Sequence, residues 1–354
     1  MASLADYGFT SFFADALAAL PEPGLEPGRV VREHRGLYRV QAAAGEMVAE
    51  NAGRLRHEAL SRVDLPAVGD FVALRASHAG RAIVHSVLPR RSVFLRRAAG
   101  TETAEQVVAA NVDTVFLVSG LDRDFNPRRI ERYLVLAWES GARPVIVLNK
   151  ADLCDDVAAR VGEVEAVAPG VAIHPVAGKA GEGLEALAGY LRPAETVAFL
   201  GSSGVGKSTL INRFLGEETL ATRAVRESDD RGRHTTTHRQ LLRLPGGALV
   251  IDTPGMRELQ LWGADESMGA IFQDVEALAA TCRFRDCGHQ GEPGCAVEQA
   301  VAEGRLPASR LESYHKLQRE LEHVHRQQDL RAQLEQKRQW RNLHRAARKH
   351  QPRG

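Results

Sequence analysis

Cysteines are scarce in this sequence, and long apolar runs are missing. The 354-residue chain has four cysteines, and three of them fall within fourteen positions, which suggests a metal site rather than a disulfide framework. Apolar runs such as 115–118 and 145–148 have the length of strands, whereas a membrane helix needs about 18 apolar residues. The first residues, MASLADYGFT, contain no basic segment followed by an apolar stretch, so we expect no secretory signal. These absences predict a cytoplasmic protein without a membrane segment.

Net charge is also small, but it is unevenly distributed. The formal net charge is +1, and 26% of the residues are charged, as is typical of soluble globular proteins. Residues 337–354, however, contain seven Lys or Arg residues and no Asp or Glu. A basic end on a near-neutral body favours an anionic partner, nucleic acid first, although a solvated helix end would have the same composition.

The pattern along the chain predicts three domains after an N-terminal extension, residues 1–27, which ends in the breaker-rich stretch PEPGLEPG. Residues 28–100 contain short strand-like runs separated by Gly, Asn and Pro, which predicts a small closed barrel of the OB or SH3 type. In residues 101–262 successive apolar runs end in polar loops, which predicts a parallel α/β sheet with its ligand at one edge. Residues 263–354 combine a Cys/His cluster with a basic helical end.

The predicted barrel is poor in aromatic residues and basic where it ends. Its aromatic side chains are mainly Tyr38, Phe71 and Phe94, so base stacking is a weak prospect. The exit segment PRRSVFLRR supplies four basic residues: Arg90, Arg91, Arg96 and Arg97. They favour contact with RNA phosphates, although arginines that merely face solvent would look the same.

A complete phosphate-binding loop, GSSGVGKS, lies at 201–208 between a predicted strand and a predicted helix. Its glycines allow backbone N–H groups to surround the phosphates, and the helix adds its positive end. Lys207 is expected to reach the β- and γ-phosphates, and the Ser208 hydroxyl to bind Mg²⁺. The predicted phosphate-binding residues are Gly201, Ser202, Ser203, Gly204, Val205, Gly206, Lys207, Ser208 and Thr209.

The motif DTPG follows the predicted strand 248–251, so its first residue, Asp252, lies at the sheet edge near the Mg²⁺ shell. The N–H of Gly255 is expected to meet the γ-phosphate. Between this motif and the phosphate loop, RGRHTTT at 231–237 suits a switch loop. One of its three threonines is expected to supply the second hydroxyl to Mg²⁺, and we choose Thr236.

The motif NKAD, formed by Asn149, Lys150, Ala151 and Asp152, indicates which base is bound. The Asp152 carboxylate can accept from both N1–H and the 2-amino group of guanine, whereas adenine would leave it unpaired, a mismatch worth factors of about 10⁴. Asn149 is expected to join this loop to the phosphate loop, and the Lys150 stem to cover the base. A further base loop is expected at Ala177, Gly178 and Lys179, where the Gly178 N–H can reach guanine O6.

The order of these motifs is unusual, because NKAD precedes the phosphate loop. In most GTPases the phosphate loop comes first and the base-reading loops come last. A sheet can bring the same loops together wherever the chain is cut, so the order predicts a circularly permuted domain. The chain also leaves this domain from DTPG directly into the Cys/His segment, which offers a path for a γ-phosphate signal.

The residue after DTPG is Met256, where many GTPases have a glutamine that orients water. Methionine cannot hold a water in this way, so slow intrinsic turnover or another water-positioning group is expected. His234, beside the threonines, is the candidate catalytic residue, although a solvent-facing loop histidine is an equal explanation.

Four potential metal ligands, Cys282, Cys287, His289 and Cys295, have the spacing C-x4-C-x-H-x5-C. Three thiolates and an imidazole form a closed tetrahedral set that is typical of structural Zn²⁺, with no open position for catalysis. The alternative is a group of unrelated cysteines beside a polar histidine. Cys154 stands alone and is expected to be a packing residue.

In combination, permuted NKAD, GSSGVGKS, GRHTTT and DTPG, the barrel exit LPRRS and C-x4-C-x-H-x5-C resemble the RsgA (YjeQ) family of ribosome small-subunit-dependent GTPases over about residues 28–300. The resemblance implies an OB-fold domain, a permuted GTPase domain and a zinc domain. It also implies a cytoplasmic factor that acts in late 30S maturation, contacts 16S rRNA and hydrolyses GTP to GDP under stimulation by that subunit. The family positions map onto 149–152 and 201–209 for GTP, onto the four zinc ligands, and onto His234. The sequence departs at Ala177, where a serine would brace the loop.

Two other functions remain open. The chain could be an RNA-binding assembly module in which GTP is a slowly hydrolysed structural ligand, as Met256 suggests. It could also be a permuted GTPase of the large subunit, against which the barrel and the Cys/His cluster argue. Asp152 disfavours a P-loop kinase or ATPase. We expect a monomer.

Overall fold

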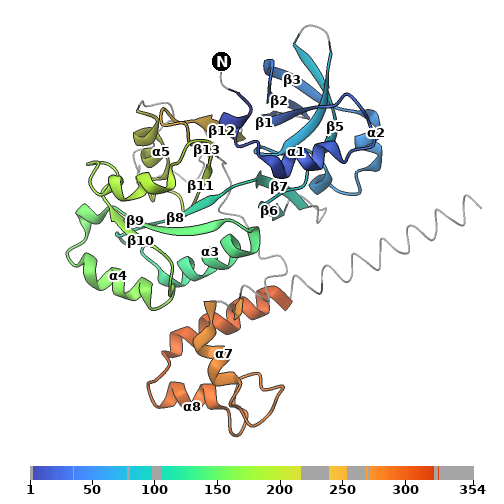
Figure 1. The fold of residues 1–354 in the computed structure, drawn as a ribbon. Coiled ribbons are helices and arrows are strands. Elements are labelled where there is room, and N and C mark those ends of the chain that lie inside the picture. The colour runs from blue at the N-terminus through green and yellow to red at the C-terminus, as the bar shows by residue number, and fades with distance from the viewer. Residues whose placement is uncertain are drawn as a thin grey trace, which may run out of the picture. The chain divides into compact units, whose positions relative to one another are not determined.

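The computed structural model describes residues 3–34, 36–77, 80–97, 105–216, 239–252, 268–269, 271–322 and 326 of the chain. The chain divides into two compact units, Met1–Gln260 and Leu261–Gly354. Figure 1 shows the elements of both units, which are described separately below. Within the described residues, no helix has both the length and the apolar character needed to cross a bilayer.

The N-terminal part of the first unit is a closed barrel. Its strands, in the described part of the chain, are β1 (Glu26–His34), β2 (Leu37–Ala42), β3 (Gly45–Asn51), β4 (Phe71–Ala76) and β5 (Arg81–Val87). Short helices accompany them: η1 (Ala5–Tyr7), α1 (Ser11–Ala18), α2 (Gly53–Glu58) and η2 (Arg62–Asp64). β1 pairs with both β2 and β4, β3 pairs with both β2 and β5, and β5 pairs with β4, so the ring of strands closes. The predicted OB-type barrel is confirmed.

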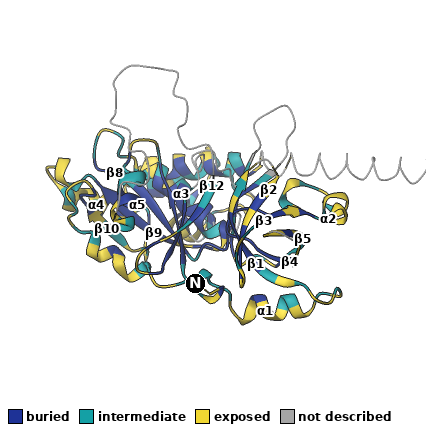
Figure 2. Cartoon of the chain, turned by 90° about the horizontal axis from the view of Figure 1, so that it is seen from above, coloured by how far each residue is buried: buried dark blue, intermediate teal, exposed yellow. Residues whose placement is uncertain are grey.

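Alternation along the barrel strands creates its core. Val30, Val40, Val72 and Val84 are fully buried on four different strands and pack together inside the ring. A second cluster lies at α1, where the Phe13 ring centroid is 4.1 Å from that of Phe71 on β4. In Figure 2 the buried residues accordingly follow the strands, while the helices outside them carry exposed residues.

One basic residue at the barrel exit does not face solvent. Arg90 binds the fully buried Asp70 through two 2.7 Å hydrogen bonds, and it also donates to the carbonyl oxygens of Val63 and Leu65. The interpretation of Arg90 as an RNA phosphate contact is therefore wrong, because its charge is used inside the protein. Arg91 is different, since 53% of its side chain is exposed.

The remainder of the first unit is an α/β sheet. Its strands within the described residues are β8 (Thr114–Gly120), β9 (Arg143–Asn149), β10 (Ile173–Val176), β11 (Thr196–Leu200), β12 (Arg239–Arg243) and β13 (Leu249–Asp252). The connecting helices are α3 (Pro127–Ser140), η3 (Ala151–Leu153), α4 (Val157–Glu165), η4 (Leu184–Tyr190) and α5 (Lys207–Leu215). The order is β10-β9-β8-β11-β13-β12, parallel except for β12. α3 and α4 lie on one face of the sheet and α5 on the other (Figure 1).

Local sequence signals explain where these helices begin and end. α3 starts after Asn126, whose side chain accepts from the Arg129 N–H, and Pro127 occupies the first helical turn. Gly141 ends the helix in the left-handed conformation, with φ of 83°.

The barrel and the sheet are continuous. β12 pairs antiparallel with β1 of the barrel, in the register Arg32↔Gln240 and Glu33↔Arg239. A separate antiparallel pair, β6 (Val93–Arg97) and β7 (Glu105–Ala110), follows the barrel in sequence and leads toward β8. The strand that follows the predicted switch loop is thus bonded directly to the barrel.

The described part of the second unit is helical. It contains α7 (Gln273–Ala279), α8 (Ala296–Ala302) and a further helix at 308–322. Its core includes Phe272 and Val275, both fully buried. Arg310 donates from Nε to Asp274 Oδ2 at 3.0 Å and lies over the Phe272 ring at 4.3 Å, which joins the third helix to α7. A largely helical C-terminal unit was expected and is present.

Candidate nucleotide site and metal cluster

The loops predicted to bind nucleotide all follow parallel strands of one sheet. β9 ends at Asn149, β10 at Val176, β11 at Leu200 and β13 at Asp252, and these strands run in the same direction. The carboxyl ends of parallel strands meet at one edge of a sheet, where α/β proteins bind ligands. The permuted chain order has therefore not separated the loops.

The phosphate loop has a backbone that requires glycine. Gly204 and Gly206 have φ angles of 79° and 99°. A Cβ at Gly206 would lie 2.2 Å from Asn149 Nδ2, so any other residue would collide with the neighbouring loop. Helix α5 begins at Lys207, directly after the loop. The unpaired backbone N–H groups of its first turn therefore point toward the loop. The Lys207 ammonium donates across the loop to the carbonyl oxygens of Gly201 at 2.7 Å and Ser202 at 2.6 Å.

Asn149 connects three loops of the site. Its Nδ2 donates to the carbonyl oxygen of Val205 in the phosphate loop at 2.7 Å, which is the connection predicted from sequence. Its Oδ1 accepts from the N–H of Gly178 in the further base loop at 2.9 Å. Asn149 is only 3% exposed, so both bonds are shielded from water. The Gly178 N–H, for which we expected guanine O6 as acceptor, donates to Asn149 in this structure.

The residues after Asn149 have different surroundings. Lys150 takes the left-handed conformation, with φ of 65°, and its ammonium pairs with Asp122 in the loop after β8. Burial would raise the pKa of Asp122, but the hydrogen bond from Lys150 and the N–H of Asp124 hold it below its usual value. Asp152, by contrast, is exposed, and none of the described residues hydrogen-bonds its carboxylate. Asp152 is thus free to accept from a ligand.

Asp252 stands at the end of β13, close to the phosphate loop. Burial raises the pKa of its carboxyl, and the charge of Lys207 opposes that shift. The two residues that bracket a triphosphate and its Mg²⁺ in P-loop proteins are therefore electrostatic neighbours here. Gly255, Met256, His234 and the three threonines of the predicted switch lie outside the described residues, as does the basic end beyond Lys337.

Two arginines contact the predicted loops without having been foreseen. Arg129, at the start of α3, donates at 2.6 Å to both Ser202 Oγ of the phosphate loop and Asp124 Oδ2. Arg213, near the end of α5, donates to the carbonyl oxygens of Gly178 and Lys179. No sequence motif marks an arginine that acts on a neighbouring loop. Only the helical position of Arg213, six residues after Lys207, connects it to the site.

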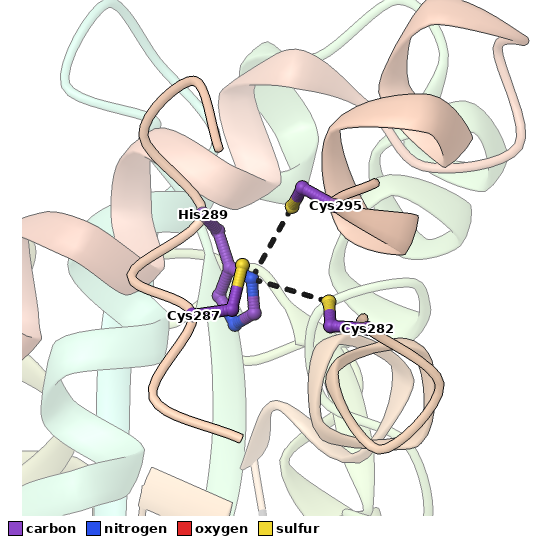
Figure 3. Close-up of side chains that lie close together, drawn as sticks. All are labelled: Cys282, Cys287, His289 and Cys295. Atoms are coloured by element: carbon purple, nitrogen blue, oxygen red, sulfur yellow. Dashed lines mark hydrogen bonds between the residues drawn. The ribbon is translucent and has the colours of Figure 1, made fainter. Parts of the chain in front are cut away.

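The second unit brings the four predicted metal ligands together. The ligand atoms of Cys282, Cys287, His289 and Cys295 all lie within 4.8 Å of one another, and Figure 3 shows the four side chains turned toward a common point. His289 Nδ1 is 3.4 Å from Cys295 Sγ and 3.7 Å from Cys282 Sγ. A tetrahedral Zn²⁺ with Zn–S of ~2.3 Å and Zn–N of ~2.0–2.1 Å would place such atoms roughly 3.5–3.8 Å apart. The donor set and its spacing fit a metal ion.

Backbone groups support this ligand set. The N–H groups of Ala296 and Glu298 at the start of α8 point at Cys282 Sγ and Cys295 Sγ, at 3.3 and 3.4 Å. Such N–H···S contacts stabilise thiolates over thiols. The cluster can therefore hold a metal ion.

The fold and the site together define a circularly permuted P-loop GTP-binding protein, with an OB-type barrel before the sheet and a Cys₃His cluster after it. Comparison with known proteins gives the family. The model of the family described as RsgA GTPase matches residues 87–262. A relative from Opitutus terrae, named small ribosomal subunit biogenesis GTPase RsgA, is 51% identical over 98% of this chain and 97% of its own length. The chain belongs to the RsgA GTPase family, whose members hydrolyse GTP.

Other relatives agree. A protein from Lactiplantibacillus plantarum, named small ribosomal subunit biogenesis GTPase RsgA 2, is 49% identical over 90% of this chain and 89% of its own length. The crystal structure of YjeQ from Thermotoga maritima is similar with a TM-score of 0.61 and 29% identity, covering 84% of this chain and 99% of that one. The crystal structure of YloQ, described as a circularly permuted GTPase, is similar with a TM-score of 0.58 and 24% identity, covering 85% of this chain and 96% of that one. This similarity shows the shared fold.

A second family model, described as ABC transporter, matches residues 184–348. This segment contains the phosphate loop but not NKAD, which lies before it. Phosphate loops of this pattern occur in ATPases and GTPases alike, so the overlap concerns the shared loop and leaves the family assignment unchanged.

Proposed function

We propose that this chain binds the 30S ribosomal subunit, hydrolyses GTP to GDP under stimulation by that subunit, and acts in late small-subunit maturation. One arrangement carries the nucleotide part: Asn149 ties the loop of an exposed Asp152 to the phosphate loop and to Gly178. The partner is inferred from the relatives, which are named for small-subunit biogenesis and match nearly the whole length of this chain.

In the proposed complex Asp152 reads the guanine, and Lys207 exchanges its two carbonyl acceptors for the β- and γ-phosphates. The hydroxyls of Ser208 and Thr236 hold Mg²⁺, with Asp252 behind them and the Gly255 N–H at the γ-phosphate. The remaining proposed contacts come from the NKAD loop, the further base loop and the phosphate loop: Asn149, Lys150, Ala151, Ala177, Gly178, Lys179, Gly201, Ser202, Ser203, Gly204, Val205, Gly206 and Thr209. Bound Mg²⁺ would neutralise the charge that develops during phosphoryl transfer.

We assign Zn²⁺ to the Cys₃His cluster. With four protein ligands there is no open position, so the ion has a structural role in the second unit. Its binding free energy would contribute to the folding of this unit, in which the ligands flank the short helices α7 and α8.

The barrel is proposed to sense the nucleotide through β12. Arg239, the first residue of that strand, lies 3.7 Å from Glu33 of β1 and donates to Val107 O at 3.0 Å and Gln106 Oε1 at 3.1 Å. A single residue, His238, lies between Arg239 and the predicted switch loop at 231–237. Any movement that GTP imposes on the switch would therefore pull on the barrel and on β7.

A second function is supported by one observation. Met256 cannot orient water as a glutamine does, so GTP could instead be a slowly hydrolysed ligand that sets the shape of an RNA-binding module. The two functions differ in turnover on the subunit and share the same binding sites. We further propose a cytoplasmic monomer whose rRNA contacts are on 16S rRNA.

Co-sedimentation tests the proposed partner. The chain, loaded with a non-hydrolysable GTP analogue or with GDP, is centrifuged with purified 30S or 50S subunits. We expect the analogue-bound chain to pellet with the 30S subunit, and a smaller fraction of the GDP-bound chain to pellet with it. Pelleting with the 50S subunit alone would support a large-subunit factor instead.

A further inference from the structure

The further base loop lacks the side chain that would ordinarily brace it. Ala177 stands where the family resemblance leads us to expect a serine, and its buried methyl group, 2% exposed, cannot form the hydrogen bond that a hydroxyl would. The loop closes on itself through two backbone bonds, from Ala177 N to Glu182 O at 3.0 Å and from Gly181 N to Ala177 O at 2.7 Å. These bonds shape the loop, and the 2.9 Å bond from the Gly178 N–H to Asn149 Oδ1 attaches its start to the base-reading loop.

Helix α5 provides a second attachment, through the carbonyl oxygens of the loop. Arg213 donates from Nε to the carbonyl oxygen of Gly178 at 3.2 Å and from Nη2 to the carbonyl oxygen of Lys179. Leu210, one turn earlier on the same helical face, packs on the loop so closely that a Cβ at Gly178 would lie 2.8 Å from Leu210 Cδ2. One face of α5 therefore contacts two successive peptide groups of the loop.

We propose that Arg213 is a positioning residue for the guanine site, acting through the backbone of Gly178 and Lys179. This inference rests on the proposed GTP binding. Arg213 would set the geometry of the pocket that holds the guanine base. α5 begins at the phosphate loop with Lys207 and ends beside the base loop, so a single helix fixes the distance between the phosphate and base contacts. The planar guanidinium can hold two carbonyl oxygens at once in a fixed direction.

A simpler explanation of Arg213 is a favourable charge near the carboxyl end of α5. Any cation interacts favourably with a helix dipole, whereas hydrogen bonds to two carbonyl oxygens at once need the forked donor geometry of arginine. Lysine at this position separates the two explanations, because it retains the charge and can reach only one carbonyl at a time.

The test compares the full-length variants R213A and R213K with wild type. Fluorescent GDP and GTP report affinity, ADP reports binding that does not use the base loop, and thermal unfolding without nucleotide reports stability. We expect R213A to weaken GDP and GTP by the same factor, on the order of tenfold, because a loop that keeps only its bond to Asn149 must be ordered further at each binding event. R213K should show most of this loss. ADP affinity and kcat should stay unchanged while KM for GTP rises.

Arg54 supplies the control, since its side chain is 76% exposed on the barrel helix α2 and, among the described residues, pairs with Glu58 alone. R54A should leave every measurement at its wild-type value. Unchanged GDP affinity in R213A, full rescue by R213K, or an equal loss for ADP would each overturn the inference. If wild type itself shows no preference for GDP over ADP, the proposed GTP site fails instead, so the two failures are distinguishable.

Discussion

Arg29 of the barrel donates a 2.8 Å hydrogen bond from Nη2 to Oγ1 of Thr196, the first residue of the strand that leads into the phosphate loop. The same guanidinium donates to Tyr7 O, to Gly69 O at 3.3 Å and to Asn111 O at 3.2 Å, and it lies over the Phe71 ring. Burial lowers the pKa of Arg29 to about 10, with Asp113 and Asp70 opposing the shift. A buried cation thus fixes the barrel to the nucleotide sheet.

Replacing Arg29 by methionine should destabilise the first unit by about 2–4 kcal/mol, because it leaves several buried oxygen acceptors without a donor. Urea unfolding followed by circular dichroism measures this loss. R39M is the matched control, since Arg39 is 57% exposed and pairs with Glu46 on the barrel surface. A loss no larger than that of R39M would mean that Arg29 does not join barrel and sheet.

Asp152 should determine the choice of base. D152N is expected to weaken GTP and to shift preference toward xanthine nucleotide, whose 2-oxo group matches the new amide donor. Competition binding with GTP and XTP measures both effects. D155N, at an exposed aspartate three positions later, should change neither. Retained GTP affinity in D152N would refute the guanine assignment.

The contact between Glu33 and Arg239 should transmit the nucleotide state to the barrel. R239M is expected to keep GTP affinity while reducing the difference in 30S binding between the GTP-analogue and GDP states. Binding curves for both states measure that difference. R243M supplies a control on the same strand, since Arg243 is exposed and its side chain lies 3.9 Å from Asp6. An undiminished difference in R239M would show that the Arg239 side chain does not carry the signal.

Metal removal should affect the two units differently. Chelation, or C287S, is expected to unfold the second unit and to abolish metal binding, while GTP affinity stays near wild type because the nucleotide loops belong to the first unit. Limited proteolysis, metal content and nucleotide titration report the three outcomes. C154S should retain the metal, since Cys154 lies outside the cluster. Equal loss of GTP binding on chelation would contradict this division.

Sequence patterns predicted the parts of the fold that depend on local rules. Short strand-like runs separated by Gly, Asn and Pro predicted the barrel. Apolar runs followed by polar loops placed the parallel strands, and because such strands share an edge, Asn149 could be assigned to the phosphate loop across 56 positions. The Cys/His spacing likewise predicted which four side chains would meet.

Long-range polar contacts of single arginines could not be predicted. Arg29, Arg129 and Arg213 have no neighbours in sequence that distinguish them from surface arginines, and their partners become visible only when the sheet is assembled. For Arg90 the sequence misled in the opposite direction. Its basic run favoured a contact with RNA, whereas the Arg90 side chain is paired with Asp70 inside the protein. Charge density in sequence says little about burial.

Multiple-turnover phosphate release with and without 30S subunits measures whether the subunit stimulates GTP hydrolysis by this chain. The matched control is K207A, which removes the ammonium that lies across the phosphate loop. We expect slow release by the chain alone, strong acceleration by 30S but not 50S subunits, and no acceleration in K207A. A rate that 30S subunits leave unchanged would contradict the proposed function.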